Sequence, residues 1–279
     1  NNAKKNGVKK PVRYSYDRRP LWGYVNEANP EIMEMEIACA AKHGVNVFIY
    51  DWYWYDNRPF LENCLNDGFL KAKNNTDMKF CLMWANHNAN HLWDKRNSDN
   101  DLETVIWSGV VTPKIFSEIC DRTIEKYFLK ENYYCIDGCP VYMIFDIDNF
   151  IRSFGSSVEC RKAIDEFRRK TVEAGFNGLH LQMVHWRNRV FNWLNDDDPQ
   201  KGVSSSEMYD FLGVDSVTNY NWGGSTDFDG DFNDITKNYI EEITKESSPL
   251  IMFFAGSISA MTRSSLPALS AAAAVAGAS

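Results

Sequence analysis

Five short apolar runs of this sequence lead into polar and aromatic side chains at the point where a β-strand would end. Carboxylates, amides and imidazoles hydrogen-bond hydroxyl groups, and the flat faces of Trp and Tyr pack against the C–H faces of a sugar ring. We therefore predict a glycan-binding site made of ten residues at the strand ends. They are Asp51, Trp52 and Tyr53 at the first run, Trp84, Asn86 and His87 at the second, Asp146 at the third, Gln182 and His185 at the fourth, and Tyr220 at the fifth.

The same residues also have purely structural interpretations. The rings of the DWYWY run (51–55) could pack beneath the rim of a barrel, and a His or Gln could complete a buried layer. Asp146 is more informative, because a carboxylate at a strand end has to be solvated or hydrogen-bonded. We assign Asp51 and Asp146 to the binding of hydroxyl groups. These strand ends imply no Ser–His–Asp arrangement and no phosphate-binding loop, and the catalytic residues stay unassigned.

Three spacings resemble metal sites but depart from the known patterns. The DFDGD run (227–231) resembles the start of a calcium loop, without the Gly at its sixth and the Glu at its twelfth position. His87 and His91 have the i, i+4 spacing of zinc ligands, yet the NHNANH segment is a poor helix former. Cys135 and Cys139 do not have the spacing of a zinc knuckle. We expect neither a metal nor a cofactor.

The elements that would position these residues follow a repeated pattern. Apolar runs rich in strand-forming residues occupy 45–50, 79–84, 140–145, 179–184, 214–217 and 250–254, and helical patterns occupy 30–43, 116–128, 158–174 and 236–245. Their alternation predicts βα units and a parallel sheet. The runs start 34 to 39 residues apart, with one interval of 61 that contains a polar insertion, 88–112. We predict an α/β fold, a (β/α)8 TIM barrel whose first and last units are missing here.

Length and composition exclude several classes of protein. The 279 residues are 44% hydrophobic and 24% charged, as in a globular domain, and the net charge of −8 disfavours nucleic acid as a partner. No apolar run is long enough to span a membrane. We expect one domain over residues 1–256, followed by a low-complexity tail over 257–279 that contains four consecutive Ala.

Longer motifs resemble a known family. The segments MEMEIACAAKHGVNVFIYDWYWY, GFLKAKNN, MKFCLMWANHN, IDGCPVYMIFDIDNF, AGFNGLHLQMV and LGVDSVTNYNW occur in collinear order between Leu21 and Trp222. Together they are similar to the glycoside hydrolase family 99-like domain, whose relatives include endo-acting α-mannosidases on (β/α)8 barrels. The resemblance puts the predicted site residues, apart from His185, at the mouths of the second to sixth barrel strands.

The resemblance implies a retaining, endo-acting glycoside hydrolase that acts on an α-linked oligosaccharide or polysaccharide. It also implies export to the periplasm, the cell surface or the medium. In family 99 the acid and base belong to an NEW-x-EG motif, and this sequence has neither that motif nor the GWD-x-x-PR segment. Three alternatives stay open: a glycosyltransferase of cell-surface glycan assembly, a catalytically inactive carbohydrate-binding barrel, and a metal-dependent hydrolase that uses His87 and Asp146.

Overall fold

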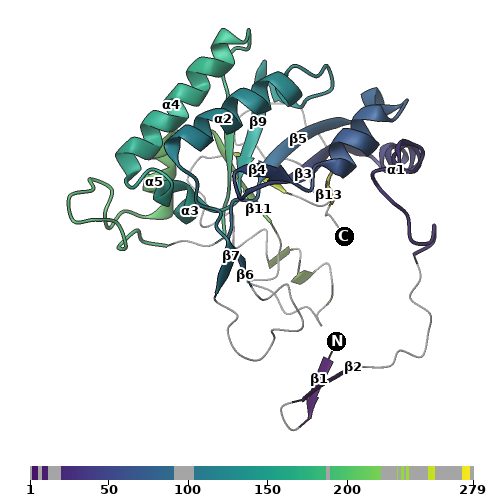
Figure 1. Cartoon of the computed structure of the whole chain (residues 1–279), viewed down its shortest axis with the longest axis horizontal. Coiled ribbons are helices and arrows are strands. Elements are labelled where there is room, and N and C mark those ends of the chain that lie inside the picture. Colours follow the sequence, from purple (N-terminus) through teal and green to yellow (C-terminus); the bar gives the residue numbers. More distant parts are fainter. Residues whose placement is uncertain are drawn as a thin grey trace.

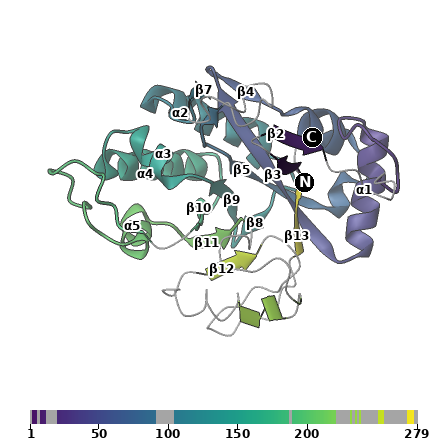
Figure 2. The same ribbon diagram turned by 90° about the horizontal axis from the view of Figure 1, so that it is seen from below.

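Seven parallel strands form one curved sheet in the order β12-β11-β10-β9-β5-β3-β13 (Figures 1 and 2). The computed structural model describes residues 20–90, 104–186 and 189–220, five positions between 231 and 238, and the backbone of β1, β2, β12 and β13. The bounds of the seven strands are β3 (Val45–Tyr55), β5 (Lys79–Trp84), β9 (Cys139–Ile144), β10 (His180–Val184), β11 (Ser216–Asn219), β12 (Ile251–Phe254) and β13 (Ala272–Ala276).

The order of the strands follows the order of the chain. From β3 to β12 each strand pairs in parallel with the next one along the sequence, so the sheet is wound in one direction throughout. A doubly wound sheet would reverse direction at a switch point. On the other side of β3 the last strand, β13, pairs in parallel with it. The α/β class with a curled parallel sheet is confirmed, while the complete eight-stranded barrel and the domain limits stay predictions.

All six predicted strands are present, and one of them is longer than predicted. β3 continues to Tyr55, because β4 (Arg58–Phe60) turns back and pairs antiparallel with its end. The DWYWY run is therefore strand and not loop. Within the described residues, three other short antiparallel pairings join β1 (Asn2–Lys5) with β2 (Val8–Pro11), β6 (Ala89–Asn90) with β7 (Val105–Trp107), and β8 (Cys135–Ile136) with β9.

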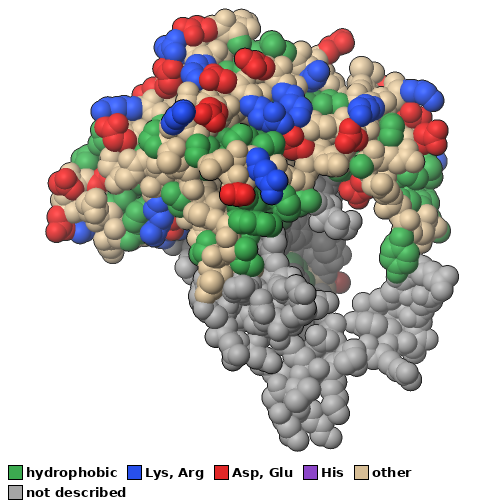
Figure 3. Space-filling model, viewed as in Figure 1, with side chains coloured by type: hydrophobic (Ala, Val, Ile, Leu, Met, Phe, Trp, Pro, Cys, Tyr) green, Lys and Arg blue, Asp and Glu red, His purple; other side chains and the backbone are tan. Residues whose placement is uncertain are grey.

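Helices cover one side of the sheet (Figure 1), and charged side chains are spread over their outer surface (Figure 3). Three of the predicted helices are confirmed, and the fourth, 236–245, lies almost entirely outside the described residues. The longer helices are α1 (Pro30–Lys42), α2 (Pro113–Thr123), α3 (Ile147–Arg152), α4 (Ser157–Glu173) and α5 (Ser205–Leu212). Short helical segments are η1 (Cys64–Gly68), η2 (Phe69–Lys71), η3 (Asn75–Asp77) and η6 (Ile124–Phe128). None of the helices of the described residues is long and apolar enough to cross a bilayer.

Local sequence explains where these helices begin. Side chains of Asn29, Thr112, Ser156 and Ser204 accept hydrogen bonds from the first-turn amides of α1, α2, α4 and α5. Such caps satisfy amides that have no partner inside the helix. At α5 the cap is reciprocal, because Glu207 also accepts from the backbone of Ser204. These caps fix the starts of the helices that pack on the outer face of the sheet.

A buried carboxylate ties this helix layer to β3. Glu62 lies between β4 and η1, and its side chain is 10% exposed. It accepts hydrogen bonds from Trp52 Nε1 and the Tyr127 hydroxyl, both at 2.8 Å. Arg122 and Lys126 contact its other oxygen at 2.6 and 3.2 Å. Burial alone would raise the pKa of Glu62, but the hydrogen bonds from Trp52, Tyr127 and Arg122 outweigh it and lower the pKa to about 2.

We expect Glu62→Gln to lower the free energy of unfolding by about 2–4 kcal/mol at pH 7, because it leaves two cations facing a neutral amide. The pKa of Glu62 is below that of an ordinary Glu, 4.5. Its contribution is therefore complete above pH 4.5 and is lost as the pH falls toward 2. Urea unfolding of both proteins at pH 7, 5 and 3 should show the difference shrinking at the lowest pH.

The matched control is Glu159→Gln, which changes an exposed carboxylate paired with Lys162 at 2.6 Å. This exposed pair should contribute little, about 0–1 kcal/mol. Equal effects of the two substitutions, or a Glu62→Gln effect that stays constant with pH, would contradict the assignment.

Candidate functional site

The alternation of side chains along β3 separates two sets of aromatic residues. Successive side chains of a strand point to opposite faces of the sheet. Asp51 and Tyr53 lie on the face away from the helices, whereas Trp52 and Trp54 lie on the helix side and contact each other with ring centroids 5.7 Å apart. Side chains that follow β5, β9, β10 and β11 converge on the same end of the first face.

Six of these side chains form a closed series of contacts, which we call the strand-end ring. Tyr53 meets His87 at 5.9 Å between ring centroids, and His87 meets Phe145 at 5.3 Å. Trp186 and Tyr220 each lie within 5.0 Å of Phe145 and 5.5 Å from each other. The Tyr220 hydroxyl lies 3.4 Å from Asp51 Oδ2, which brings the series back to β3. The members are Asp51, Tyr53, His87, Phe145, Trp186 and Tyr220.

The carboxyl of Asp51 is the acidic group of this ring. Burial raises the pKa of Asp51 to about 6, against the lowering effect of the hydrogen bond from Tyr220. Its second oxygen, Oδ1, is buried and has no hydrogen-bond partner among the described residues. The pKa of Tyr53 is raised to about 12, first by burial and then by the charge of Asp51. A carboxyl whose pKa lies near 6 and whose second oxygen has no hydrogen-bond donor can donate or accept a proton during a reaction.

Asn86 and Asp146 join two of the strand ends beneath the ring. The side-chain amide of Asn86 donates from Nδ2 to the backbone carbonyl of Asp146 and accepts at Oδ1 from the backbone N–H of Asp146, both at 2.7 Å. Asn86 is 1% exposed. The carboxylate of Asp146 caps α3 by accepting from the amides of Asp148 and Asn149. Burial raises the pKa of Asp146, in part offset by these bonds. Both residues hold the loops that carry His87 and Phe145.

The structure corrects the placement of two predicted site residues, Trp52 and Trp84. Trp84 is 0% exposed, stacks on Phe116 of α2 at 5.8 Å and meets Phe150 of α3 edge to face. Trp52, which pairs in register with Trp84, is 2% exposed and donates to Glu62. The alternation of β3 and β5 directs both indoles into the core between sheet and helices. Neither can stack on a sugar.

Gln182 and His185 also lie outside the ring. Gln182 is 4% exposed and donates to Ser216 Oγ at 2.9 Å, inside the sheet and below the strand ends. A ring nitrogen of His180 lies 2.7 Å from the same hydroxyl. His185 Nδ1 lies 3.2 Å from the Tyr209 hydroxyl of α5, and burial lowers the pKa of this His. These contacts favour the interpretation that Gln182 completes a buried layer.

Of the ten predicted residues, the ring contains four. The ten did not include Phe145 and Trp186, although Phe145 ends the predicted run 140–145 and Trp186 lies two residues beyond the predicted run 179–184. The signal that identifies them is the two-residue period, which puts Phe145 on the same face as Met143 and away from Tyr142. Trp186 is 40% exposed and donates from Nε1 to the Phe145 carbonyl at 3.1 Å, so its ring is fixed at the strand ends.

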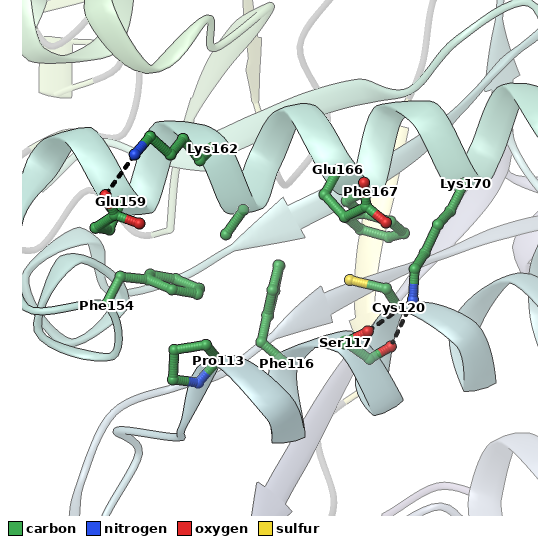
Figure 4. A pocket seen from close by; sticks show the side chains of 11 residues that line it. Pro113, Phe116, Ser117, Cys120, Phe154, Glu159, Lys162, Glu166, Phe167 and Lys170 are labelled. Carbon is green, nitrogen blue, oxygen red and sulfur yellow. Dashed lines mark hydrogen bonds and ion pairs between the residues drawn. The ribbon is translucent and has the colours of Figure 1, made fainter.

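A groove of about 290 Å³ lies elsewhere, between α2 and α4 (Figure 4). Its floor is formed by Phe116, Phe154 and Phe167, and an ion pair between Lys162 and Glu159 borders it. No residue of the strand-end ring lines it. Among the described residues no three His, Cys, Asp or Glu side chains lie close enough together to hold a metal ion. His91 and most of the DFDGD run lie outside the described residues.

Comparison with known proteins gave a family match over most of the chain. A family model described as "Glycosyltransferase WbsX" matches residues 17–249. The uncharacterized protein WxcX of Xanthomonas campestris pv. campestris (strain B100) is 27% identical over 77 residues, which are 28% of this chain and 11% of that protein. The chain thus matches only a small part of this curated relative.

Solved structures gave weaker likenesses. A GH99 endo-alpha-mannosidase from Bacteroides thetaiotaomicron has a TM-score of 0.47 and 14% identity, over 86% of this chain and 57% of that one. A structure titled "Glycoside hydrolase-like protein" has a TM-score of 0.46 and 18% identity, over 88% of this chain and 68% of that one.

We expect Asp51→Asn to stabilise the protein at pH 8, because burial disfavours the ionised carboxylate that the wild type carries there. The pKa of Asp51, about 6, lies above the ordinary value of 3.8. The penalty is therefore absent below pH 3.8 and grows as the pH rises through 6. After discounting for solvent screening, the gain at pH 8 should be on the order of 1–2 kcal/mol.

Urea unfolding between pH 4.5 and 8 measures this gain, and Asp210→Asn, at an exposed position of α5, is the control that should show no such trend. A loss of stability at pH 8 in Asp51→Asn would refute the electrostatic assignment of Asp51.

Proposed function

The chain belongs to the family described as "Glycosyltransferase WbsX", and we propose that within this family it is a glycoside hydrolase that cleaves an α-linked glycan in an endo, retaining reaction. The recognition of a family 99-like domain in the sequence is confirmed by the match, which contains the whole region from Leu21 to Trp222. The reaction type, the linkage and the position of cleavage are our proposal.

The observation that carries the proposal is the strand-end ring. Aromatic side chains from five strand ends form one series of contacts that reaches the carboxyl of Asp51 through Tyr220, and Trp186 keeps 40% of its surface exposed. Such rings bind the C–H faces of a sugar, and the carboxyl and the hydroxyls of Tyr53 and Tyr220 can hydrogen-bond its hydroxyl groups. Ligands of βα barrels bind at this end of the strands.

In this reaction Asp51 would serve as the proton donor. Cleavage of a glycosidic bond breaks the bond between the anomeric carbon and the leaving oxygen, and that oxygen takes the electron pair and a proton. The pKa of Asp51 is raised to about 6 by its burial, so a useful fraction of the acid form exists at neutral pH. Retention requires that a nucleophile, which the six residues of the strand-end ring do not supply, first takes the place of the leaving oxygen at the anomeric carbon. Water then displaces this nucleophile, adds its hydroxyl to the anomeric carbon and returns its proton to the Asp51 carboxylate.

A glycosyltransferase is the second candidate, because the family description names that activity. A transferase that used a sugar nucleotide would have to bind a diphosphate, for which proteins use Lys, Arg or a metal ion. The six members of the strand-end ring include one carboxyl and neither Lys nor Arg. This charge pattern favours a neutral glycan over a nucleotide sugar as the ligand of the ring.

The deciding experiment incubates the protein with α-mannan oligosaccharides and a panel of other α-linked glycans, with and without nucleotide sugars. New reducing ends of internal cleavage, with retained anomeric configuration by NMR, would support the proposal. Nucleotide release that requires both donor and acceptor would assign a transferase. Binding by calorimetry without any turnover would assign a carbohydrate-binding barrel.

We expect Trp186→Ala to weaken glycan binding about ten-fold, since an aromatic stacking contact contributes about 1 kcal/mol or somewhat more. The matched control is Trp193→Ala, which removes an indole of similar exposure, 38% against 40%. The Trp193 indole packs against the Arg152 guanidinium at 4.3 Å, and Trp193 is not a member of the strand-end ring. Calorimetry of both variants tests the site, and equal affinities for the two would show that the glycan binds elsewhere.

A further inference from the structure

A second group of aromatic residues continues the strand-end ring along β3. Tyr55, Phe60 and Trp107, which we call the hairpin strip, come from β3, β4 and β7. Trp107 stacks on Tyr55 with ring centroids 5.8 Å apart and meets Phe60 at 5.4 Å. Tyr53 of the ring contacts both Tyr55, at 5.9 Å, and Phe60, at 6.3 Å. The strand-end ring and the hairpin strip therefore form one continuous cluster of aromatic side chains.

The backbone holds the strip in place. Tyr55 donates its hydroxyl proton to the His87 carbonyl at 2.9 Å, which ties the end of β3 to the loop after β5. The chain that leaves this loop through β6 returns after β7, where the Gly109 amide donates to Asn88 Oδ1 at 2.9 Å. A Cβ at Gly109 would lie 2.0 Å from the Asn86 carbonyl oxygen, so only glycine lets the chain return this closely.

The strip presents an exposed surface over a buried base. Tyr55 is 2% exposed, whereas Trp107 above it is 38% exposed, and its neighbours Val105 and Ile106 are each 45% exposed. Figure 3 shows hydrophobic side chains gathered at the lower edge of the described part, over the β6–β7 hairpin. Leu61, directly after Phe60, is 44% exposed and has a φ of 56°, a left-handed conformation that is costly for this residue. Strain of this kind concentrates at functional sites.

We propose that the hairpin strip is a second sugar-binding position of the same site, so that the ligand is a chain of several linked sugars. This inference rests on the proposed function. The occupant follows from continuity with the strand-end ring and from the absence of charged side chains among the three residues of the strip. From Asp51 to Tyr55 the strand advances about 13 Å, which is longer than one sugar ring. A chain bound along β3 would thus contact both groups at once.

Calorimetry with α-linked mannose oligosaccharides of two and six units tests the proposal, or the same two lengths of whichever α-glycan the wild type binds. Trp107→Ala should weaken binding of the six-unit chain about ten-fold and leave binding of the two-unit chain within two-fold. Trp107→Phe, which keeps a ring on Tyr55, should lose less. Trp193→Ala is the control for removal of an exposed indole, and circular dichroism verifies the fold of each variant.

If Trp107→Ala weakened binding of the two-unit and six-unit oligosaccharides equally, or weakened neither, the proposal of a second sugar-binding position would be overturned. Conversion of a dimer to a monomer by Trp107→Ala, measured by light scattering, would also overturn it and assign the strip to contact with a second copy. Failure of the proposed function has a different signature, because Trp186→Ala would then leave the binding of both lengths unchanged.

Discussion

Side chains alternate between the two faces of a β-strand, and on β3 this alternation decides what the DWYWY run can do. Asp51 and Tyr53 reach the strand-end ring, and Tyr55 supports the hairpin strip behind it. Trp52, on the opposite face, donates to Glu62 and so connects the sheet to α2 and η6. One strand thus carries the candidate site on one face and the main polar contact of the helix layer on the other. A shift of β3 by one residue would exchange the two sets.

Sequence patterns predicted the strands and the helices well, since continuous apolar runs and capping residues act locally. The sequence patterns did not predict where β3 ends. Its last residues are strand because they pair with β4, and the apolar run alone does not indicate this pairing. The sequence predicted the position of the candidate site at the strand ends, but only some of the residues that form it. Residue type suggested Trp84 as a sugar platform, yet Phe116 and Phe150, 32 and 66 residues further on in the sequence, enclose it. Phe145 has no polar group to attract notice, and only its position at a strand end reveals it.

Two acidic side chains, Asp51 on β3 and Glu62 after β4, have pKa values shifted in opposite directions although both are largely buried. Glu62 has five donors, and the hydrogen bonds keep its pKa near 2 despite burial. Asp51 has one donor, Tyr220, and keeps an oxygen without a partner, so burial raises its pKa to about 6. The contacts of Glu62 stabilise the fold and keep this carboxyl ionised, so it cannot act as a proton donor near neutral pH. The arrangement around Asp51 gives up stability at neutral pH for a group that can exchange a proton, as active sites commonly do.

The hydrogen bond between Gly109 and Asn88 has a consequence for how such a site can diversify. Because the chain departs and returns at one point, a longer segment between these residues would cost little more in loop-closure entropy, about 0.6 kcal/mol for each doubling of its length. A different hairpin at this point would replace Trp107, which packs on Tyr55 and Phe60. The six residues of the strand-end ring lie outside this segment and would stay as they are.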